Sequence, residues 1–184
     1  MAEAVGPVRQ QLEFLLNGYS CYAHRERARA DDLLVRERAA AHLQAAAATV
    51  RDLASAYRRQ YIPDPSREHP FPPTAALAGL RQIERLQAAL EDAAVRVRDQ
   101  ALPASDRTWA RLRGEHTALD LALAFDHRLI LQAEAVRRAC GAPTAADLGP
   151  APAEGATPLA AVGAALGDLL QTLEDRGAHL ALPG

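Results

Sequence analysis

The chain has 184 residues and a formal net charge of −2 at pH 7, so it has the length of one ordinary domain and no overall positive field for nucleic acid or an anionic membrane. Alanine supplies 42 residues and leucine 26, whereas β-branched and aromatic residues are scarce. Because alanine and leucine are among the strongest helix formers, the composition predicts an all-α fold.

Several classes of protein do not fit the sequence. There is no apolar run close to 18 residues, and the first residues lack the basic-then-apolar order of a signal peptide. Cys21 and Cys140 are far apart and match no zinc or redox spacing. The sequence therefore predicts a cytoplasmic protein with no membrane span and no cofactor.

The first half of the chain predicts two helices. A short helix is expected over residues 7–16, and Asn17-Gly18 is a strong signal for a break or kink. Residues 19–62 then contain neither proline nor glycine, a run of 44 residues. If this run is helical throughout, it spans ~66 Å at 1.5 Å per residue.

The two halves of this long helix differ in polarity. The N-terminal half is polar, and Arg27–Asp31 and Asp32–Arg36 have the spacing of charge pairs on a solvated helix. The C-terminal half has an apolar seam at the coiled-coil period, made by Leu43, Ala46, Ala47, Val50, Leu53, Ala54, Tyr57 and Tyr61. We expect one half to be buried and the other to project or to meet a partner.

Two further long helices are predicted after a connector with five prolines between residues 63 and 73. The first covers residues 74–102, where apolar residues recur at alternating steps of three and four. The second covers residues 105–140, with Ser105 as its N-cap and Gly114 inside the pattern.

The end of the chain predicts a tethered helix. Residues 141–156 are rich in glycine, alanine and proline and are typical of a flexible linker, and residues 157–184 form an amphipathic helix. The sequence thus predicts an elongated antiparallel bundle over residues 1–140, built on one very long helix. The last helix either docks back onto this bundle or fills a groove on another chain.

Two sets of residues are candidates for binding a partner. Tyr57, Tyr61 and Phe71 form either a staple that locks the proline connector or a recognition patch. The apolar face of the last helix is the second candidate, through Leu166, Leu169 and Leu173.

The most unusual polar residues lie between positions 105 and 140. His116, Asp120 and His127 share one broad helical face, and Asp126 falls on the apolar seam. Such a stripe could ligate a metal ion in a bundle core, although the chain has no Glu-x-x-His motif. The alternative is that His116 and Asp126 are buried polar groups with hydrogen-bond partners, or that they lie at an interface.

Arg111 and His116 also resemble the arginine–histidine signature of the HEPN family of helical ribonucleases. The resemblance implies an arginine and a histidine that act at a dimer cleft on the RNA phosphate and 2′-hydroxyl. It covers these two residues only, and Leu112 stands where that family commonly has a polar residue.

No other catalytic set is visible in the sequence. The serines are not in a Gly-x-Ser-x-Gly elbow, and no phosphate-binding glycine loop is present. The sequence therefore favours a non-catalytic helical binding protein: an assembly factor, adaptor, chaperone or structural subunit. We expect a protein partner, a homo-oligomer or both, and neither nucleic acid nor membrane. The alternative is a metal-binding protein or HEPN-like ribonuclease centred on His116.

Overall fold

The structure is a computed structural model that describes residues 5–62, 64, 67, 71–101, 106–150 and 158–182. Its elements are α1 (Val5–Leu15), the short 3₁₀ helix η2 (Arg25–Arg27), α2 (Ala28–Tyr61), α3 (Thr74–Arg98), α4 (Asp106–Gly114), α5 (His116–Cys140), α6 (Ala145–Leu148) and α7 (Pro158–Ala181). No strand occurs within these ranges, so the predicted all-α class is confirmed.

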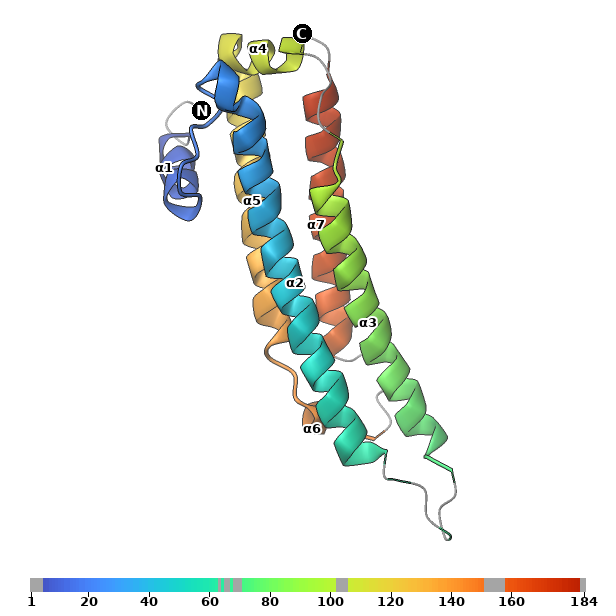
Figure 1. Ribbon diagram of the computed structural model, residues 1–184. Helices are drawn as coiled ribbons and strands as arrows, with labels where there is room; N and C mark the ends of the chain where they lie inside the picture. The colour runs from blue at the N-terminus through green and yellow to red at the C-terminus, as the bar shows by residue number, and fades with distance from the viewer. Residues whose placement is uncertain are drawn as a thin grey trace.

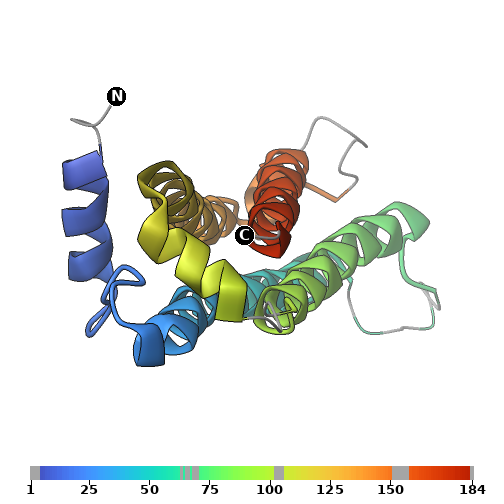
Figure 2. The same ribbon diagram turned by 90° about the horizontal axis from the view of Figure 1, so that it is seen from above.

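The long helices α2, α3, α5 and α7 lie side by side in an elongated bundle (Figure 1). α2 and α3 form one antiparallel hairpin, and α5 and α7 form another. Across the two hairpins, however, α2 packs on α5 and α3 packs on α7, and each of these pairs runs in parallel. The chain therefore crosses the bundle diagonally between α3 and α5, and α4 makes that crossing at one end (Figure 2).

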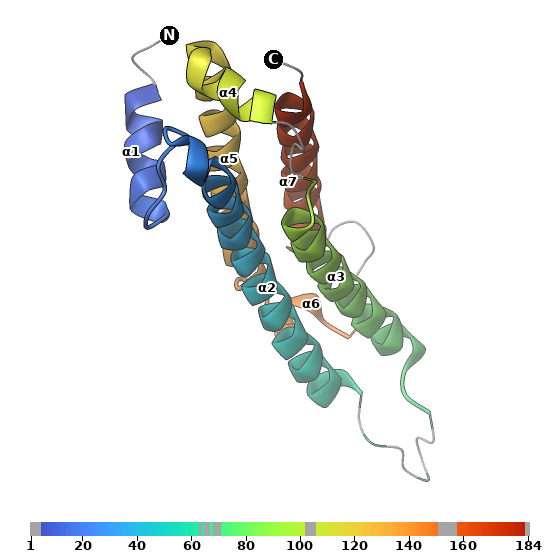
Figure 3. The ribbon, with the colours of Figure 1, turned by 45° about the horizontal axis from the view of Figure 1, so that its top comes forward.

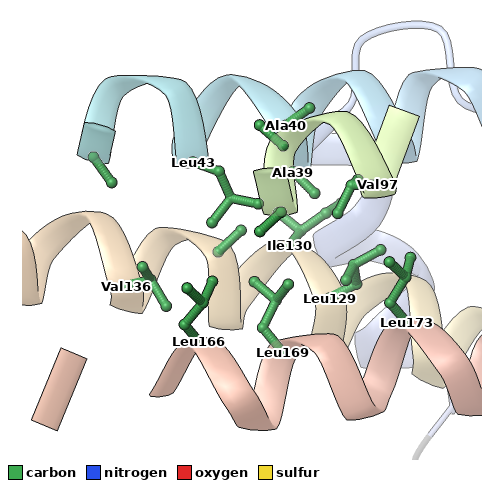
Figure 4. Close-up of a cluster of buried hydrophobic side chains, with 14 of the residues drawn as sticks. Ala39, Ala40, Leu43, Val97, Leu129, Ile130, Val136, Leu166, Leu169 and Leu173 are labelled. Carbon is green, nitrogen blue, oxygen red and sulfur yellow. The ribbon is translucent and has the colours of Figure 1, made fainter. Parts of the chain in front are cut away.

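The core lies where the four long helices face one another. Figure 4 shows Leu43 of α2, Ile130 of α5 and Leu169 of α7 pointing into this shared interior. All three are fully buried, and Val97 of α3 closes the same layer. Each such leucine or isoleucine contributes about 1.5–3 kcal/mol by leaving water. The apolar residues that recur along the sequence therefore form the core and stabilise the bundle.

The predicted helix over residues 19–62 is wrong in its first part, because α2 begins only at Ala28. Gly18 has a φ of +84°, and Cys21 and Tyr22 have φ values of 52° and 59°. Left-handed backbone at these positions cannot continue a right-handed helix. The chain between α1 and η2 is consequently an irregular loop, and α2 is 34 residues long.

The predicted single helix over residues 105–140 is also wrong, because it is divided at Glu115 into α4 and α5. Glu115 has extended backbone, with φ −118° and ψ 104°, and Gly114 before it has a low helix propensity. The break allows α4 to turn across the end of the bundle, where Trp109 and Leu112 are buried.

The remaining helix ends lie close to their predicted positions. α3 begins at Thr74 as expected and ends at Arg98, earlier than the predicted residue 102. α7 begins at Pro158 and ends at Ala181, inside the predicted range 157–184. It packs against α5 and α3 of its own chain, so the last helix docks in cis.

Part of the segment expected to be a flexible linker is helical. α6 is capped by Thr144, whose side-chain oxygen accepts from the backbone N–H of Asp147, while the Asp147 carboxylate accepts from Thr144 in return. Ala145 and Leu148 are buried, and α6 packs against α2. Residues 151–156 of the predicted linker, and residue 157 at the predicted start of the last helix, lie outside the described residues.

α2 and α3 extend beyond α5 and α7 at one end of the bundle (Figure 1). The apolar seam in the C-terminal half of α2 is buried even here, as the sequence predicts, and it leaves no open edge for a neighbouring chain. Val50 and Tyr57 are at most 1% exposed and Leu53 is 7% exposed. The seam is covered because α3 packs along α2 and α6 adds a second cover near this end.

Candidate functional site

One face of the polar start of α2 is buried, so the expectation of a solvated helix is wrong for that face. Asp31, Asp32 and Arg36 are at most 6% exposed. The predicted pair of Asp32 and Arg36 is present, with 2.7 Å between Arg36 Nε and Asp32 Oδ2. Arg27, in contrast, donates to the backbone carbonyl of Gly18 instead of pairing with Asp31. These buried charges therefore need partners from other elements.

Arg176 of α7 supplies the partner that joins three helices. Its Nη2 lies 2.7 Å from Asp32 Oδ1 on α2, and its Nε lies 2.7 Å from Asp126 Oδ1 on α5. The hydroxyls of Tyr19 and Tyr22 donate to Asp126 Oδ2 at 2.7 and 2.8 Å. We call these five residues the Arg176 cluster. It ties the loop after α1 to α2, α5 and α7.

The protonation states in the Arg176 cluster follow from its burial. Burial and the negative charge of Asp126 raise the pKa of Tyr19 and Tyr22 well above 10, so both hydroxyls remain donors at neutral pH. Burial opposes the charge on Arg176, but the carboxylates of Asp126 and Asp32 outweigh it and raise its pKa well above the ordinary value. Replacing a whole buried ion pair by apolar residues is often neutral for stability, whereas removing one partner leaves an uncompensated buried charge and is strongly destabilising.

Asp31 holds the backbone of the same loop. Its Oδ1 accepts from the backbone N–H of Ser20 at 3.0 Å. Its Oδ2 accepts from the Ser20 hydroxyl at 2.6 Å and from the backbone N–H of Tyr22 at 2.8 Å. These bonds stabilise the left-handed backbone of Cys21 and Tyr22, which L-residues seldom adopt. The loop therefore has one defined path from α1 to α2.

This loop places α1 outside the four-helix core, beside α5 (Figures 2 and 3). Leu12 and Leu16 are the anchors, at 0% and 4% exposed. Val8 and Leu15 are only partly buried, and no further helix in the described part of the chain covers α1 on its outer side. One flank of α1 and the neighbouring face of α5 therefore remain open.

The open surface between α1 and α5 is hollowed into two adjoining spaces of about 440 and 560 Å³, which share His127 and Leu131. We call this surface the α1–α5 groove. Helix α1 contributes Pro7, Val8, Gln10, Gln11, Phe14 and Leu15, and α5 contributes Ala124, His127, Arg128, Leu131, Gln132, Ala135 and Arg138. Phe14 is 90% exposed and Leu131 is 40% exposed, so two large apolar side chains face solvent here.

The rim of the α1–α5 groove is cationic. Arg128 and Arg138 line it, and no acidic residue lines it within the described part of the chain. Arg138 has only a long contact of 4.0 Å with Glu134. Burial lowers the pKa of His127, so this imidazole is neutral at pH 7. The groove thus combines an apolar floor with two guanidinium groups.

The aromatic residues predicted to bind a partner do not form one patch. Tyr57 is fully buried, Tyr61 is partly buried and its ring centroid is 5.0 Å from that of Tyr57. Phe71, in contrast, is 84% exposed. The two tyrosines thus belong to the core at the end of α2, and a role for Phe71 in binding stays a prediction.

The predicted binding face of the last helix is inside the bundle. Leu166, Leu169 and Leu173 are at most 5% exposed. Figure 4 shows all three pointing from α7 into the shared core. They are therefore core residues in the single chain, and a partner could reach them only if α7 detached.

The four residues of the predicted metal or polar-core set are not brought together. Asp126 is a buried polar residue of the Arg176 cluster, so the alternative of buried polar groups holds for Asp126 and not for His116. His116 is exposed at the start of α5, and Asp120 and His127 are partly buried. Within the described residues, no group of three or more His, Cys, Asp or Glu side chains has a geometry that could hold a metal ion.

Arg111 and His116, which resemble the HEPN signature, lie in two different helices. Arg111 Nη2 donates to the backbone carbonyl of His179 at 2.7 Å. The arginine is therefore engaged in fixing the end of α7, while His116 is exposed.

Several residues important to this site were not singled out from the sequence. Phe14 carries a signal in principle, because it lies off the apolar side of its short helix. The sequence gives no such signal for Leu131 or Arg176. The exposure of Leu131 and the burial of Arg176 depend on how helices that are distant in sequence pack.

Neither a family model, nor a curated protein, nor a solved structure matches this chain. None of the helices in the described ranges is both long enough and apolar enough to span a membrane.

Proposed function

We propose that the protein is a non-catalytic helical binding protein that holds an acidic amphipathic helix of a partner protein in the α1–α5 groove. The observation that carries the proposal is Phe14, a 90% exposed aromatic side chain beside an open apolar groove with a cationic rim. The proposal keeps the cytoplasmic location expected from the sequence.

The apolar floor supports a macromolecular partner. An isolated exposed leucine is ordinary on a protein surface, but a contiguous apolar surface rimmed by polar groups is typical of an interaction site. Phe14, Leu15 and Leu131 make such a surface together with Val8. Aromatic side chains are common anchors of binding energy, so Phe14 is the expected anchor here.

The shape of the groove supports a helix as the occupant. Its α5 wall, from Ala124 to Arg138, follows the helix axis for roughly 21 Å at 1.5 Å per residue. Ala124 and Ala135 are small, which allows another helix to approach closely. An amphipathic helix that lays its apolar face into such a groove is a recurring mode of recognition.

The charge of the rim supports an acidic partner and argues against a second copy of the chain. Arg128 has no ion-pair partner among the described residues, and Arg138 has only its long contact with Glu134. A two-fold contact of groove with groove would bring these cations together without new carboxylates. Glu13 of α1 pairs with Arg9 at 3.1 Å and does not line the groove.

The test is a comparison of captured proteins from the native source. The bait is the wild-type chain, the double variant Phe14→Ser/Leu131→Ser, or the matched control Phe71→Ser, which also removes an exposed phenylalanine. We expect at least one protein to be captured by wild type and by Phe71→Ser and lost with the groove variant. Its contact segment, mapped by cross-linking, should be amphipathic and acidic.

A charge reversal sharpens the same test. Arg128→Glu should weaken capture, whereas Arg59→Glu, an exposed arginine near the far end of α2, should not. Identical captured proteins for wild type and the groove variant would overturn the proposal. So would self-association that is lost with Phe14→Ser, because a second copy would then be the occupant.

A further inference from the structure

A second hollow lies at the end of the bundle where α4 crosses it, away from the α1–α5 groove. It has a volume of about 280 Å³ and is lined by Arg25, Glu26, Arg29, Asp106, Trp109 and Arg113. Three guanidinium groups and two carboxylates therefore face one small space, an excess of one positive charge. The volume is just below the range of about 300–1,000 Å³ common for ligand pockets, so any ligand is small.

Two residues that line this hollow each have a buried donor atom without an acceptor. Trp109 is only 2% exposed, and its indole Nε1 has no hydrogen-bond partner within the described part of the chain. Arg113 is partly buried, and its Nη1 is likewise buried without a partner there. A buried donor without an acceptor is unfavourable, and most strongly so when it is charged.

The carboxylates at the hollow do not supply the missing acceptor. Asp106 is shared by two arginines, with Arg25 Nη2 at 3.4 Å from Oδ2 and Arg29 Nη2 at 3.2 Å from Oδ1. These three side chains are more than half exposed, so their pairs are weak and can rearrange around a ligand. Arg113 has no carboxylate within ion-pair distance among the described residues.

We infer that this hollow is a binding site for the oxyanion of a small molecule, a phosphoryl or carboxylate group. The two unpartnered atoms are N–H donors that are closed to solvent in this structure, and the surplus of positive charge among the lining side chains selects a negative ligand. The guanidinium of Arg113 matches the geometry of phosphate and carboxylate oxygens. The inference does not depend on the function proposed for the α1–α5 groove.

The position of Trp109 makes the site directly observable. It is the single tryptophan of the chain, and its ring stacks on that of Tyr22 with centroids 5.7 Å apart. Intrinsic tryptophan fluorescence therefore comes from a residue that lines this hollow. We would titrate the full-length protein with pyrophosphate and, separately, with malonate at constant ionic strength, and use sodium chloride as the control for screening.

We expect a saturable change in fluorescence with pyrophosphate or malonate and none with sodium chloride, and the two titrations distinguish a phosphoryl from a carboxylate ligand. Arg113→Gln should weaken binding by about tenfold or more, because it removes a charged donor. Arg58→Gln is the matched control: this exposed arginine pairs with Glu84 far from the hollow, and its loss should leave the dissociation constant unchanged.

A second variant keeps the test valid if Arg113→Gln folds poorly. The Arg25 side chain is 74% exposed, so Arg25→Gln should fold normally and still weaken binding. A response that does not saturate with either anion would overturn the inference. Equal affinity in the wild type, Arg25→Gln and any folded Arg113→Gln would overturn it as well.

Discussion

Removal of the Arg176 side chain should destabilise the protein more than removal of any exposed arginine. Arg176 is 1% exposed and donates at 2.7 Å to Asp32 and Asp126, at 2.8 Å to Gln100 and at 3.3 Å to Tyr22. In Arg176→Met the methionine fills part of the volume, but two buried carboxylates lose their shared cation.

The size of the effect follows from this loss. Breaking a buried ion pair by removing one partner costs about 3–5 kcal/mol. A change of 1 kcal/mol shifts the melting temperature of a domain of this size by about 2–4 °C, so Arg176→Met should lower it by about 6–20 °C. Arg96→Met is the matched control, since Arg96 and Glu174 form an exposed pair at 3.3 Å that is worth about 0.2–1 kcal/mol.

Thermal melts and urea unfolding of both variants measure the difference. A double variant, Arg176→Met/Asp126→Asn, separates lost contacts from the uncompensated charge. Because Asp126→Asn removes one buried negative charge, the loss of stability in the double variant should be smaller than the sum of the single losses by about 0.5–3 kcal/mol. If Arg176→Met were no more destabilising than Arg96→Met, the Arg176 cluster would not hold the helices as we describe.

Two further predictions concern the loop between α1 and α2. Burial and Asp126 raise the pKa of Tyr19 and Tyr22 above 10, so the folded protein keeps protons that the unfolded chain releases near pH 10. This contribution to the free energy of unfolding is complete below pH 10 and is lost as the pH rises, by about 1.4 kcal/mol per pH unit for each tyrosine. Urea unfolding between pH 9 and 11 should show the loss. If the free energy of unfolding fell with pH equally steeply in Tyr19→Phe/Tyr22→Phe, the prediction would be contradicted. Gly18→Ala should cost about 1–2 kcal/mol, because Gly18 has a φ of +84°. Gly163 lies in helix α7, and no atom lies within 4 Å of an added Cβ, so Gly163→Ala should instead stabilise the protein by about 0.5–1 kcal/mol. Thermal melts that rank the two variants in the opposite order would refute the backbone conformations described for Gly18 and Gly163.

The sequence predicts the helices of this fold far better than their breaks. The apolar stripes of α3 and α7 are visible because burial on one face imposes a period of 3.6 residues. The loop before α2 contains no proline or glycine from Tyr19 onward. The left-handed backbone of Cys21 and Tyr22 is held by hydrogen bonds from the N–H groups of Ser20 and Tyr22 to Asp31. Such a tertiary contact leaves no local signal.

The candidate site was less predictable than the fold. Asp126 on the apolar seam correctly indicated a buried polar group, since a carboxylate at a core position needs partners. Its main partner, Arg176, is 50 residues away and looks like any other arginine of an arginine-rich chain. The exposure of Phe14 and Leu131 depends on the angle at which α1 leaves the bundle, and the loop sets this angle through side-chain contacts.

The most direct test of the α1–α5 groove is photocross-linking in the native source, with the photoreactive residue p-benzoylphenylalanine in place of Leu131. The same residue in place of Phe71 is the control, because that position is exposed but lies outside the groove. The proposal predicts that position 131 cross-links to a partner segment whose apolar residues recur every three or four positions between acidic ones. Cross-links from position 131 only to another copy of this chain, or to the same proteins as position 71, would contradict it.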